Sequence, residues 1–182
     1  AKSGSPYKVY TPYYNTVVGR PVAQPIALNE YAIRFPHIAP ESNSINAFEL
    51  LPSSNWDKEF ERKWEVTEEA AQKCLRDFLD QSVDRYQYDR DRPDRRGTSV
   101  LSPYLHFGQI GPRQIVQSLK EKSDLSHEGP RVYLKEIYWR EFAYHVLYHF
   151  PKTPDMPLQS KYANFPWKYD ATLQEQWEIL EI

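Results

Sequence analysis

Helical spacing of apolar side chains, which begins after helix-capping residues, is the feature that most constrains the fold of this chain. Thr67 is followed by Glu68 and Glu69, an N-cap with acidic residues in the first turn. The pattern predicts a helix from residue 68 to about residue 85. Its apolar residues at helical spacing are Ala71, Cys74, Leu75, Phe78 and Leu79.

Two prolines predict further helix starts, because proline is tolerated at the first helical position. Pro112 and Pro130 indicate helices at about 112–122 and 130–149, and a last short helix is expected from Thr172. No strand–helix alternation and no repeat occurs, so the sequence predicts a mostly α domain with long loops. The helix from Pro130 bears Leu134, Ile137, Tyr138, Phe142, Val146 and Leu147.

The first third of the chain is the least regular part. Residues 7–13 alternate in a way typical of a short strand, but the sequence to about residue 66 is rich in Pro, Asn and Ser. We therefore predict an irregular connector over residues 1–66 and a helical domain over residues 67–182. The apolar residues expected to pin the connector are Ile26, Leu28, Phe35, Leu50 and Leu51.

Composition limits the class of protein. The 182 residues, 40% hydrophobic and 26% charged, suit one globular domain with a real core. No apolar run approaches the roughly 18 residues of a membrane span, and the single Cys74 permits no internal disulfide, as expected in a reducing compartment. The start at Ala1 has neither an initiator methionine nor a signal peptide, so we expect an excised or processed beginning.

Net charge gives no general attraction to nucleic acid, because the formal charge is only −2. Binding of that kind would need a local basic patch, and residues 86–120 contain one. It consists of Arg90, Arg92, Arg95, Arg96, Arg113 and Lys120, against Asp89, Asp91 and Asp94.

The segment from Tyr86 to Ser102 has the composition of a site for phosphates and rings. Gly97 permits a positive φ and a close approach of the backbone to a ligand, while Thr98, Ser99 and Ser102 supply hydroxyl donors beside amides that can form an anion-binding nest. A pyrophosphate suits this combination, and Tyr86 offers a flat face to a ring or sugar. Alternatively, Thr98 and Ser99 cap the next helix and the arginines form a solvated face.

A second cluster lies on the helix predicted from Pro130. Glu136 precedes Trp139 by three residues and Arg140 by four, so the three share a helix face. This set suits a flipped-out base: the indole stacks, the acid hydrogen-bonds the base edge and the arginine holds phosphate. The alternative places Trp139 in the core, with Glu136 and Arg140 as an ordinary helix ion pair.

Glu141, His145 and His149 follow at spacings of four and could supply three metal ligands. We favour local hydrogen bonding for the two histidines, because Tyr148 and Phe150 crowd the region and no second histidine–carboxylate helix completes a site. No metal is expected, and a metal-dependent hydrolase is the outside alternative.

Several spaced motifs occur along the chain in a definite order. Their residues are Val9 to Tyr13, Tyr86, Arg90, Pro93, Gly97 to Ser99, Leu101 to Leu105, Phe107, Gly108, Ile110, Pro112 to Gln114, Trp139 to Phe142, His145, Tyr148 to Pro151, and Phe165 to Trp167. In this order they resemble the flavin-binding domain of the DNA photolyase and cryptochrome family. The resemblance extends from about Tyr7 to about Trp177, and residues 9–13 resemble the family's crossing from an N-terminal α/β antenna domain.

The resemblance implies a helical domain folded around a bent FAD. In the family's photolyases, light excites the fully reduced flavin, which passes an electron to a pyrimidine dimer flipped out of DNA; the cyclobutane ring splits and the electron returns. By position, Glu136 would hydrogen-bond or protonate the dimer and Trp139 would stack beside it as the catalytic pair. Tyr86, Tyr133, Thr98, Ser99, Val100, Leu101, Ser102 and Arg140 would bind the cofactor, and Arg90, Glu136, Trp139 and Arg140 would contact DNA.

The activity implied is that of a deoxyribodipyrimidine photo-lyase, a carbon–carbon lyase that acts on UV-damaged DNA. A cytoplasmic, DNA-associated protein with no membrane attachment is expected. The alternatives are a cryptochrome-type blue-light photoreceptor and a non-catalytic DNA-binding helical module. The motifs distinguish neither cyclobutane dimers from (6-4) lesions nor one antenna pigment from another.

The chain departs from the family pattern at four places. Val100 stands where many relatives have a basic or small residue, Tyr133 where several repair enzymes have Trp, and Gly111 where a serine often precedes the helix. After Trp177 the family usually continues through a Gly-x-Thr-Gly segment into a second helical half, whereas this sequence ends at Ile182. We therefore expect residues 1–182 alone to be inactive, the antenna pigment to be bound by an N-terminal domain outside them, and the flavin cleft to be completed by the C-terminal half or by self-association.

Overall fold

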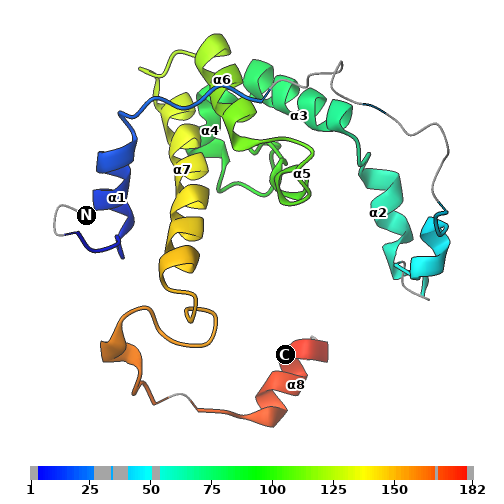
Figure 1. The fold of residues 1–182 in the computed structure, drawn as a ribbon, viewed down its shortest axis with the longest axis vertical. Coiled ribbons are helices and arrows are strands. Elements are labelled where there is room, and N and C mark those ends of the chain that lie inside the picture. Colours follow the sequence, from blue (N-terminus) through cyan, green and yellow to red (C-terminus); the bar gives the residue numbers. More distant parts are fainter. Residues whose placement is uncertain (1–3, 27–33, 35–40, 51–53, 167, 180–182) are drawn as a thin grey trace. The chain divides into compact units, whose positions relative to one another are not determined.

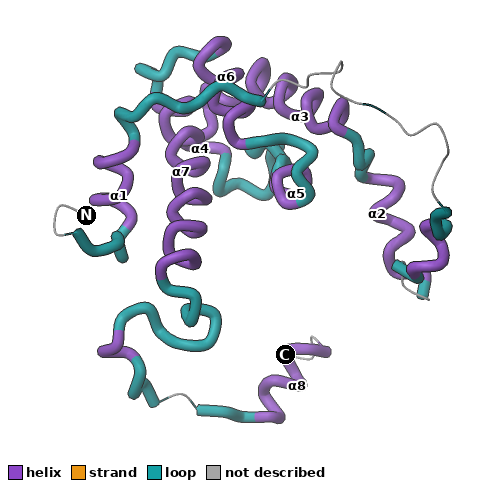
Figure 2. The backbone as a smooth tube through the Cα atoms, viewed as in Figure 1, coloured by secondary structure: helices purple, strands orange, loops and turns teal. Residues whose placement is uncertain are grey.

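The computed structural model describes residues 4–26, 34, 41–50, 54–166 and 168–179, and these form helices and loops without a strand (Figures 1 and 2). The mostly α fold predicted from the sequence is thus confirmed. The chain divides into two units, Gly19–Tyr138 and Ala1–Val18 with Trp139–Ile182, and the boundary falls within one helix. Each unit is described by itself.

The Gly19–Tyr138 unit contains most of the helices. These are α2 (Lys58–Lys63), α3 (Glu68–Gln81), α4 (Tyr86–Asp89), α5 (Ser102–His106), α6 (Pro112–Lys122) and the first half of α7 (Glu128–His149). The unit also contains three short 3₁₀ turns: η2 (Ile45–Phe48) and η3 (Asn55–Asp57) before α2, and η4 (Val83–Arg85) between α3 and α4.

The core of this unit forms where α3, α6 and α7 bury their apolar faces. Leu75 of α3 and Ile115 and Leu119 of α6 are fully buried, and α3 contacts α6 directly. Phe78 and Tyr133 bring α3 and α7 together, with ring centroids 4.5 Å apart. This core holds in place the loops that carry the candidate site.

The second unit is smaller. It contains α1 (Tyr10–Val17), the second half of α7, a 3₁₀ turn η5 (Ser160–Tyr162) and α8 (Ala171–Ile179). Phe142 is its buried side chain, with 8% exposed. The rings of Tyr10 and Tyr13 lie 5.8 and 5.2 Å from it. Aromatic contacts therefore join α1 to this half of α7.

The predicted helices agree with the structure in most of their bounds. Residues 112–122 form a helix as expected, and the Thr67 hydroxyl accepts from the Ala70 amide at 3.1 Å, which confirms the N-cap. The helix predicted to about residue 85 ends at Gln81, because Ser82 leaves the helical conformation. The long helix begins at Glu128, two residues before Pro130, since amides in a first turn lack helical partners and proline is tolerated there.

Two predictions for the N-terminal region are wrong. Residues 7–13 do not form a strand, because α1 begins at Tyr10 and accommodates Pro12 in its first turn. Ile26 and Leu50 are not pins, since they are 90% and 75% exposed and the buried cluster is built from residues 70–137. The other pins, Leu28, Phe35 and Leu51, and the motif residue Trp167 lie outside the described residues. The division into residues 1–66 and 67–182 stays a prediction.

Within the described part of the chain, none of the helices has both the length and the apolar character that crossing a bilayer requires.

Candidate functional site

The loop before α5 is shaped by a close approach of two backbone segments. A Cβ added to Gly97 would lie 2.3 Å from the Asp89 carbonyl oxygen. Gly97 itself does not have a positive φ; among the described residues of this loop it is Val100 that does, at 54°. The sequence argument from backbone freedom at Gly97 was therefore wrong, and the glycine is required for space.

The conformation at Val100 suits an anion. Left-handed Val100 is followed by right-handed Leu101, with φ −88° and ψ −3°, and such a succession turns neighbouring amides toward one side. Thr98 and Ser102 are exposed, and their hydroxyls have no hydrogen-bonding partner among the described residues. The N-cap of α5 is Leu101, so Thr98 and Ser99 do not cap that helix as the alternative interpretation required. The hydroxyls of Thr98 and Ser102 are therefore available to a ligand.

Tyr86 and Tyr133 form an aromatic wall next to this loop. Both side chains are buried, their ring centroids are 5.1 Å apart, and both contact Phe78. Burial raises the pKa of Tyr133 to about 12, although a hydrogen bond with Ser99 opposes the shift. Burial also raises the pKa of Tyr86. Both phenols are therefore neutral at neutral pH, and their buried rings form part of the wall beside the loop.

Arg90 and Glu136 come together from positions 46 residues apart in the chain. The Arg90 guanidinium donates to the Glu136 carboxylate, and this hydrogen bond is the main reason why the pKa of Arg90 is raised. The guanidinium also lies over the Tyr86 ring, 5.4 Å from its centroid. Both partners are half-buried, so the carboxylate of Glu136 has a defined place and remains accessible.

The remainder of the basic patch is partly neutralised by its own acidic residues. Arg92 pairs with Asp94 at 3.2 Å, and Arg95 lies 3.6 Å from Asp89 and 3.7 Å from Asp94. Because these acids alternate with the arginines in one loop, the free positive charge is smaller than the composition indicated. In the part of the chain that the structure describes, the members without a carboxylate partner are Arg96, Arg113 and Lys120.

Trp139 and Arg140 belong to the second unit. Trp139 is 45% exposed and stacks on Tyr10 with centroids 3.6 Å apart and planes within 10°, so it is not the core residue of the alternative interpretation. Arg140 donates to Glu141 at 3.1 Å and lies over the Tyr144 ring at 4.7 Å. The ordinary helix ion pair between Glu136 and Arg140 is therefore not formed.

The hydrogen bond of His145 is not local, contrary to the sequence expectation, because its partner lies 138 residues away in the chain. The Tyr7 amide donates to His145 Nε2 at 3.0 Å, and the His145 and His149 rings are 4.5 Å apart. Burial is the main cause that lowers the pKa of His145, and the neighbouring His149 lowers it further. Over the described ranges, no group of three or more metal-ligating side chains comes together.

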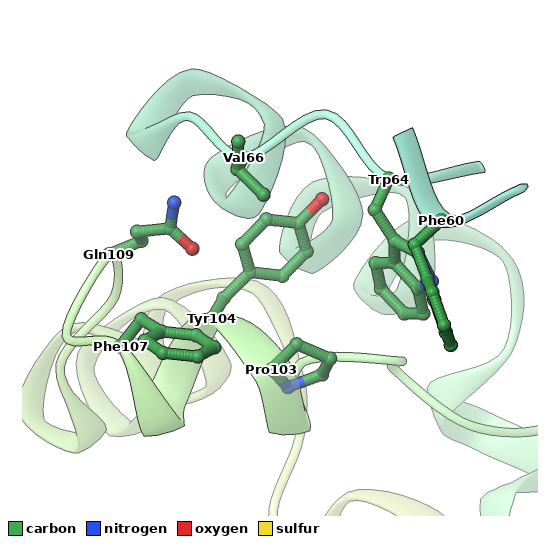
Figure 3. Close-up of a pocket in the computed structure, with 7 residues that line it drawn as sticks. All are labelled: Phe60, Trp64, Val66, Pro103, Tyr104, Phe107 and Gln109. Atoms are coloured by element: carbon green, nitrogen blue, oxygen red, sulfur yellow. The ribbon is translucent and has the colours of Figure 1, made fainter. Parts of the chain in front are cut away.

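Sequence reasoning missed one feature of the Gly19–Tyr138 unit, an apolar cavity of about 410 Å³ (Figure 3). Figure 3 shows the Tyr104 ring in its interior, and the Tyr104 hydroxyl donates to the Glu65 carbonyl at 2.9 Å. One signal that could have found it is the spacing of four between Phe60 and Trp64. The lining residues are Phe60, Trp64, Val66, Pro103, Tyr104, Phe107 and Gln109.

Comparison with known proteins identifies relatives of this architecture. A family model described as the FAD binding domain of DNA photolyase matches residues 133–179. Deoxyribodipyrimidine photo-lyase of Agrobacterium fabrum is 33% identical over 178 residues, which are 97% of this chain and 37% of that protein. Cryptochrome-2 of Arabidopsis thaliana is 29% identical over 124 residues, which are 64% of this chain and 20% of that protein.

A solved structure resembles the whole described fold. The crystal structure of a bacterial class III photolyase from Agrobacterium tumefaciens matches with a TM-score of 0.85 and 32% sequence identity, over 97% of this chain and 37% of that one. The chain thus spans little more than a third of the length of these photolyases. On its sequence motifs, its helical fold and these similarities, the chain belongs to the DNA photolyase and cryptochrome family.

Proposed function

We propose that the full-length protein carrying this chain is a light-driven DNA repair photolyase that splits pyrimidine dimers. The observation that carries the proposal is the half-exposed indole of Trp139 on α7, the helix that also presents Glu136, a carboxylate held by Arg90. A flipped-out base needs a stacking surface and a polar group for its edge. The spacing of three along one helix supplies both on one face.

FAD is the cofactor that we propose for the loop between Gly97 and Ser102. The free hydroxyls of Thr98 and Ser102 and the amides around Val100 fit the phosphates of a dinucleotide, because both groups offer hydrogen-bond donors to an anion. Ser99 and Leu101 would line the part of the loop that faces the ribityl chain of FAD. When bound and excited by light, the reduced flavin would supply the electron that splits the dimer.

Tyr86, Tyr133 and Arg140 complete the proposed cofactor set. The two tyrosines would act as the wall of the flavin pocket, because they are buried next to the loop and stay neutral. Arg140 has donors beyond those that Glu141 and Tyr144 accept, so it would reach a phosphate of the cofactor or of DNA.

Arg90 and Glu136 would act together at the damaged base. Glu136 would hydrogen-bond the base edge while Arg90 fixes the position of the carboxylate. A guanidinium has five N–H donors, and Glu136 and Asp91 use only some of them, so Arg90 would also contact a DNA phosphate. UV-damaged DNA is thus the proposed partner, in a cytoplasmic, DNA-associated protein whose antenna pigment lies outside this chain.

The decisive experiment compares damaged and undamaged oligonucleotides with the full-length protein, together with a light-dose repair curve. Trp139→Ala should weaken binding of dimer-containing DNA by about 1–3 kcal/mol, since one stacking surface is lost, and should leave undamaged DNA nearly unaffected. Tyr148→Ala is the control, because Tyr148 is an exposed aromatic residue of the same helix. Equal effects of the two substitutions would contradict the proposed site.

Glu136→Gln tests the second half of the site. Loss of the carboxylate should lower the repair yield more than the affinity, because the charge that develops on the dimer loses a hydrogen-bonding partner while the stacking surface remains. A yield equal to that of the unmodified protein would remove Glu136 from the chemistry.

A cryptochrome-type photoreceptor is the second candidate, because a cryptochrome is among the relatives of this chain. Both proteins would bind flavin, so flavin content does not separate them. A flavin-containing full-length protein without light-dependent repair of either cyclobutane or (6-4) lesions would favour the photoreceptor. A protein that binds DNA without flavin would favour the non-catalytic module.

A further inference from the structure

We propose that Tyr10 is a positioning residue for Trp139: it covers one face of the indole and holds the other face open for a damaged base. The inference rests on the proposed function and adds a residue of α1 to the same site. Tyr10 lies in the first turn of α1 and Trp139 lies on α7, within one structural unit.

The contact between the two rings is an almost complete face-to-face overlap. Their centroids are 3.6 Å apart and their planes differ by 10°. The Tyr14 ring follows on the same helix, 5.6 Å from Tyr10 and 29° from parallel. A rotation of the indole out of its plane would lose the overlap, so Tyr10 restricts the orientation of Trp139.

The exposure of Trp139 indicates which surface is left for a ligand. The residue is 45% exposed although Tyr10 covers one face, and its ring contact with Phe142 is edge-on, at 5.8 Å and 76°. The open surface is therefore largely the face opposite Tyr10. A base that stacks there would extend the series Tyr14, Tyr10 and Trp139 by one more plane, as in stacking sites for single nucleotides.

A purely structural pair would show a different pattern. Phe142 is the buried ring of this cluster and meets both Tyr10 and Trp139 edge-on. If the Tyr10–Trp139 stack only filled the core, the indole would be buried to the same degree as Phe142. It is instead a large apolar ring that stays accessible and is fixed from one side, which is the arrangement that a stacking platform requires.

The test is a double-mutant cycle in the full-length, flavin-containing protein. Tyr10→Leu should raise the Kd for dimer-containing DNA about threefold to tenfold, as expected for loss of an aromatic pair, and leave the Kd for undamaged DNA within twofold. Tyr10→Phe keeps the ring and should behave like the unmodified protein. In a Trp139→Ala background, Tyr10→Leu should cause no further loss, because its effect passes through the indole.

The matched control is Asn15→Ala, a substitution at an exposed position of α1. An equal loss on both DNAs, or the same loss from Tyr10→Leu with and without Trp139, would overturn the inference and make Tyr10 a structural residue. Failure of the proposed function has another signature, in which the unmodified protein itself shows no preference for dimer-containing DNA. That result would remove the base-positioning role along with the function.

A spectroscopic measurement reads the stack directly. In protein labelled with 5-fluorotryptophan, the resonance that disappears in Trp139→Phe identifies this indole. Tyr10→Leu should shift that resonance, whereas Tyr10→Phe should leave it close to its original position. An unmoved resonance in Tyr10→Leu would mean that the rings do not stack, and would overturn the inference whatever the repair assay gives.

Discussion

Replacement of Gly97 by alanine is the sharpest test of how the loop before α5 is built. The added Cβ would lie 2.3 Å from the Asp89 carbonyl oxygen, 2.5 Å from the carbonyl carbon and 2.7 Å from Cβ of Asp89. Ordinary van der Waals contact begins at 3.4 Å, so the two segments must separate by roughly 1 Å. The atoms met first are backbone atoms, which cannot rotate away as the end of a flexible side chain would.

The expected cost follows from this geometry. Overpacking by a single methyl group typically costs about 1–3 kcal/mol, and a clash with rigid backbone belongs at the upper end of that range. Separation of the segments would also disturb the Asp89 carboxylate, which pairs with Arg85 at 3.2 Å and lies 3.6 Å from Arg95. We therefore expect Gly97→Ala to lower the free energy of unfolding by about 3 kcal/mol.

Urea titration of the full-length protein measures this loss, and Gly19→Ala is the matched control. A Cβ at Gly19 meets nothing within 4 Å and the residue has no positive φ, so alanine there should be neutral or stabilise by up to about 1 kcal/mol. Flavin content measured in parallel should fall for Gly97→Ala alone. If both variants unfold at the same urea concentration, the close approach of Gly97 to Asp89 does not exist in solution.

Three further predictions test other parts of the chain. Val100→Gly should raise the free energy of unfolding by up to about 1 kcal/mol, because a β-branched residue at φ 54° is strained. Val66→Gly, at an exposed residue outside the left-handed region, should lower the free energy of unfolding instead. Equal effects of the two substitutions would contradict the strain at Val100. The native pKa of His145 is below its ordinary 6.5, so the unfolded state takes up the proton first as pH falls below about 6.5, and the free energy of unfolding decreases. His145→Gln should reduce this pH dependence, measured by urea titration at pH 7.5 and 5.5. An unchanged pH dependence would show that other groups cause it. Arg90→Ala should lower the slope of log K for DNA binding against log salt concentration by about one, and should also lower the repair yield. Arg113→Ala should leave the repair yield unchanged. An unaltered slope for Arg90→Ala would mean that Arg90 acts only as the ion-pair partner of Glu136.

The helices were predictable from the sequence because their determinants are local. Thr67 caps α3 through a hydrogen bond to an amide three residues on, and Pro112 begins α6 with a fixed φ. Such signals act within one turn and do not depend on the remainder of the fold. The same locality made residues 7–13 misleading, because a short alternation is typical of a strand. Tyr10, Tyr13 and Tyr14, at spacings of three and four, in fact share one side of α1.

The partners of the site residues were not predictable in the same way. Glu136 shares a helix face with Arg140, yet the guanidinium that pairs with it belongs to Arg90, at the C-terminal end of α4. A pairing across 46 residues depends on how α4 and α7 pack, and no local pattern encodes it. Tyr10 was likewise missed as a partner of Trp139, since only the packing of α1 on α7 brings their rings together.

The loop that would hold the cofactor is fixed from both ends, which explains why it tolerates a strained residue. At one end Gly97 rests on the Asp89 backbone, and the Ser82 hydroxyl donates to the Arg96 carbonyl at 3.1 Å. At the other end Leu101 is fully buried. With both ends held, the connecting residues have few conformations left, and Val100 takes a positive φ that its side chain would otherwise avoid. Strain that persists in this way keeps the amides of the loop oriented before any anion arrives, so ligand binding need not organise them.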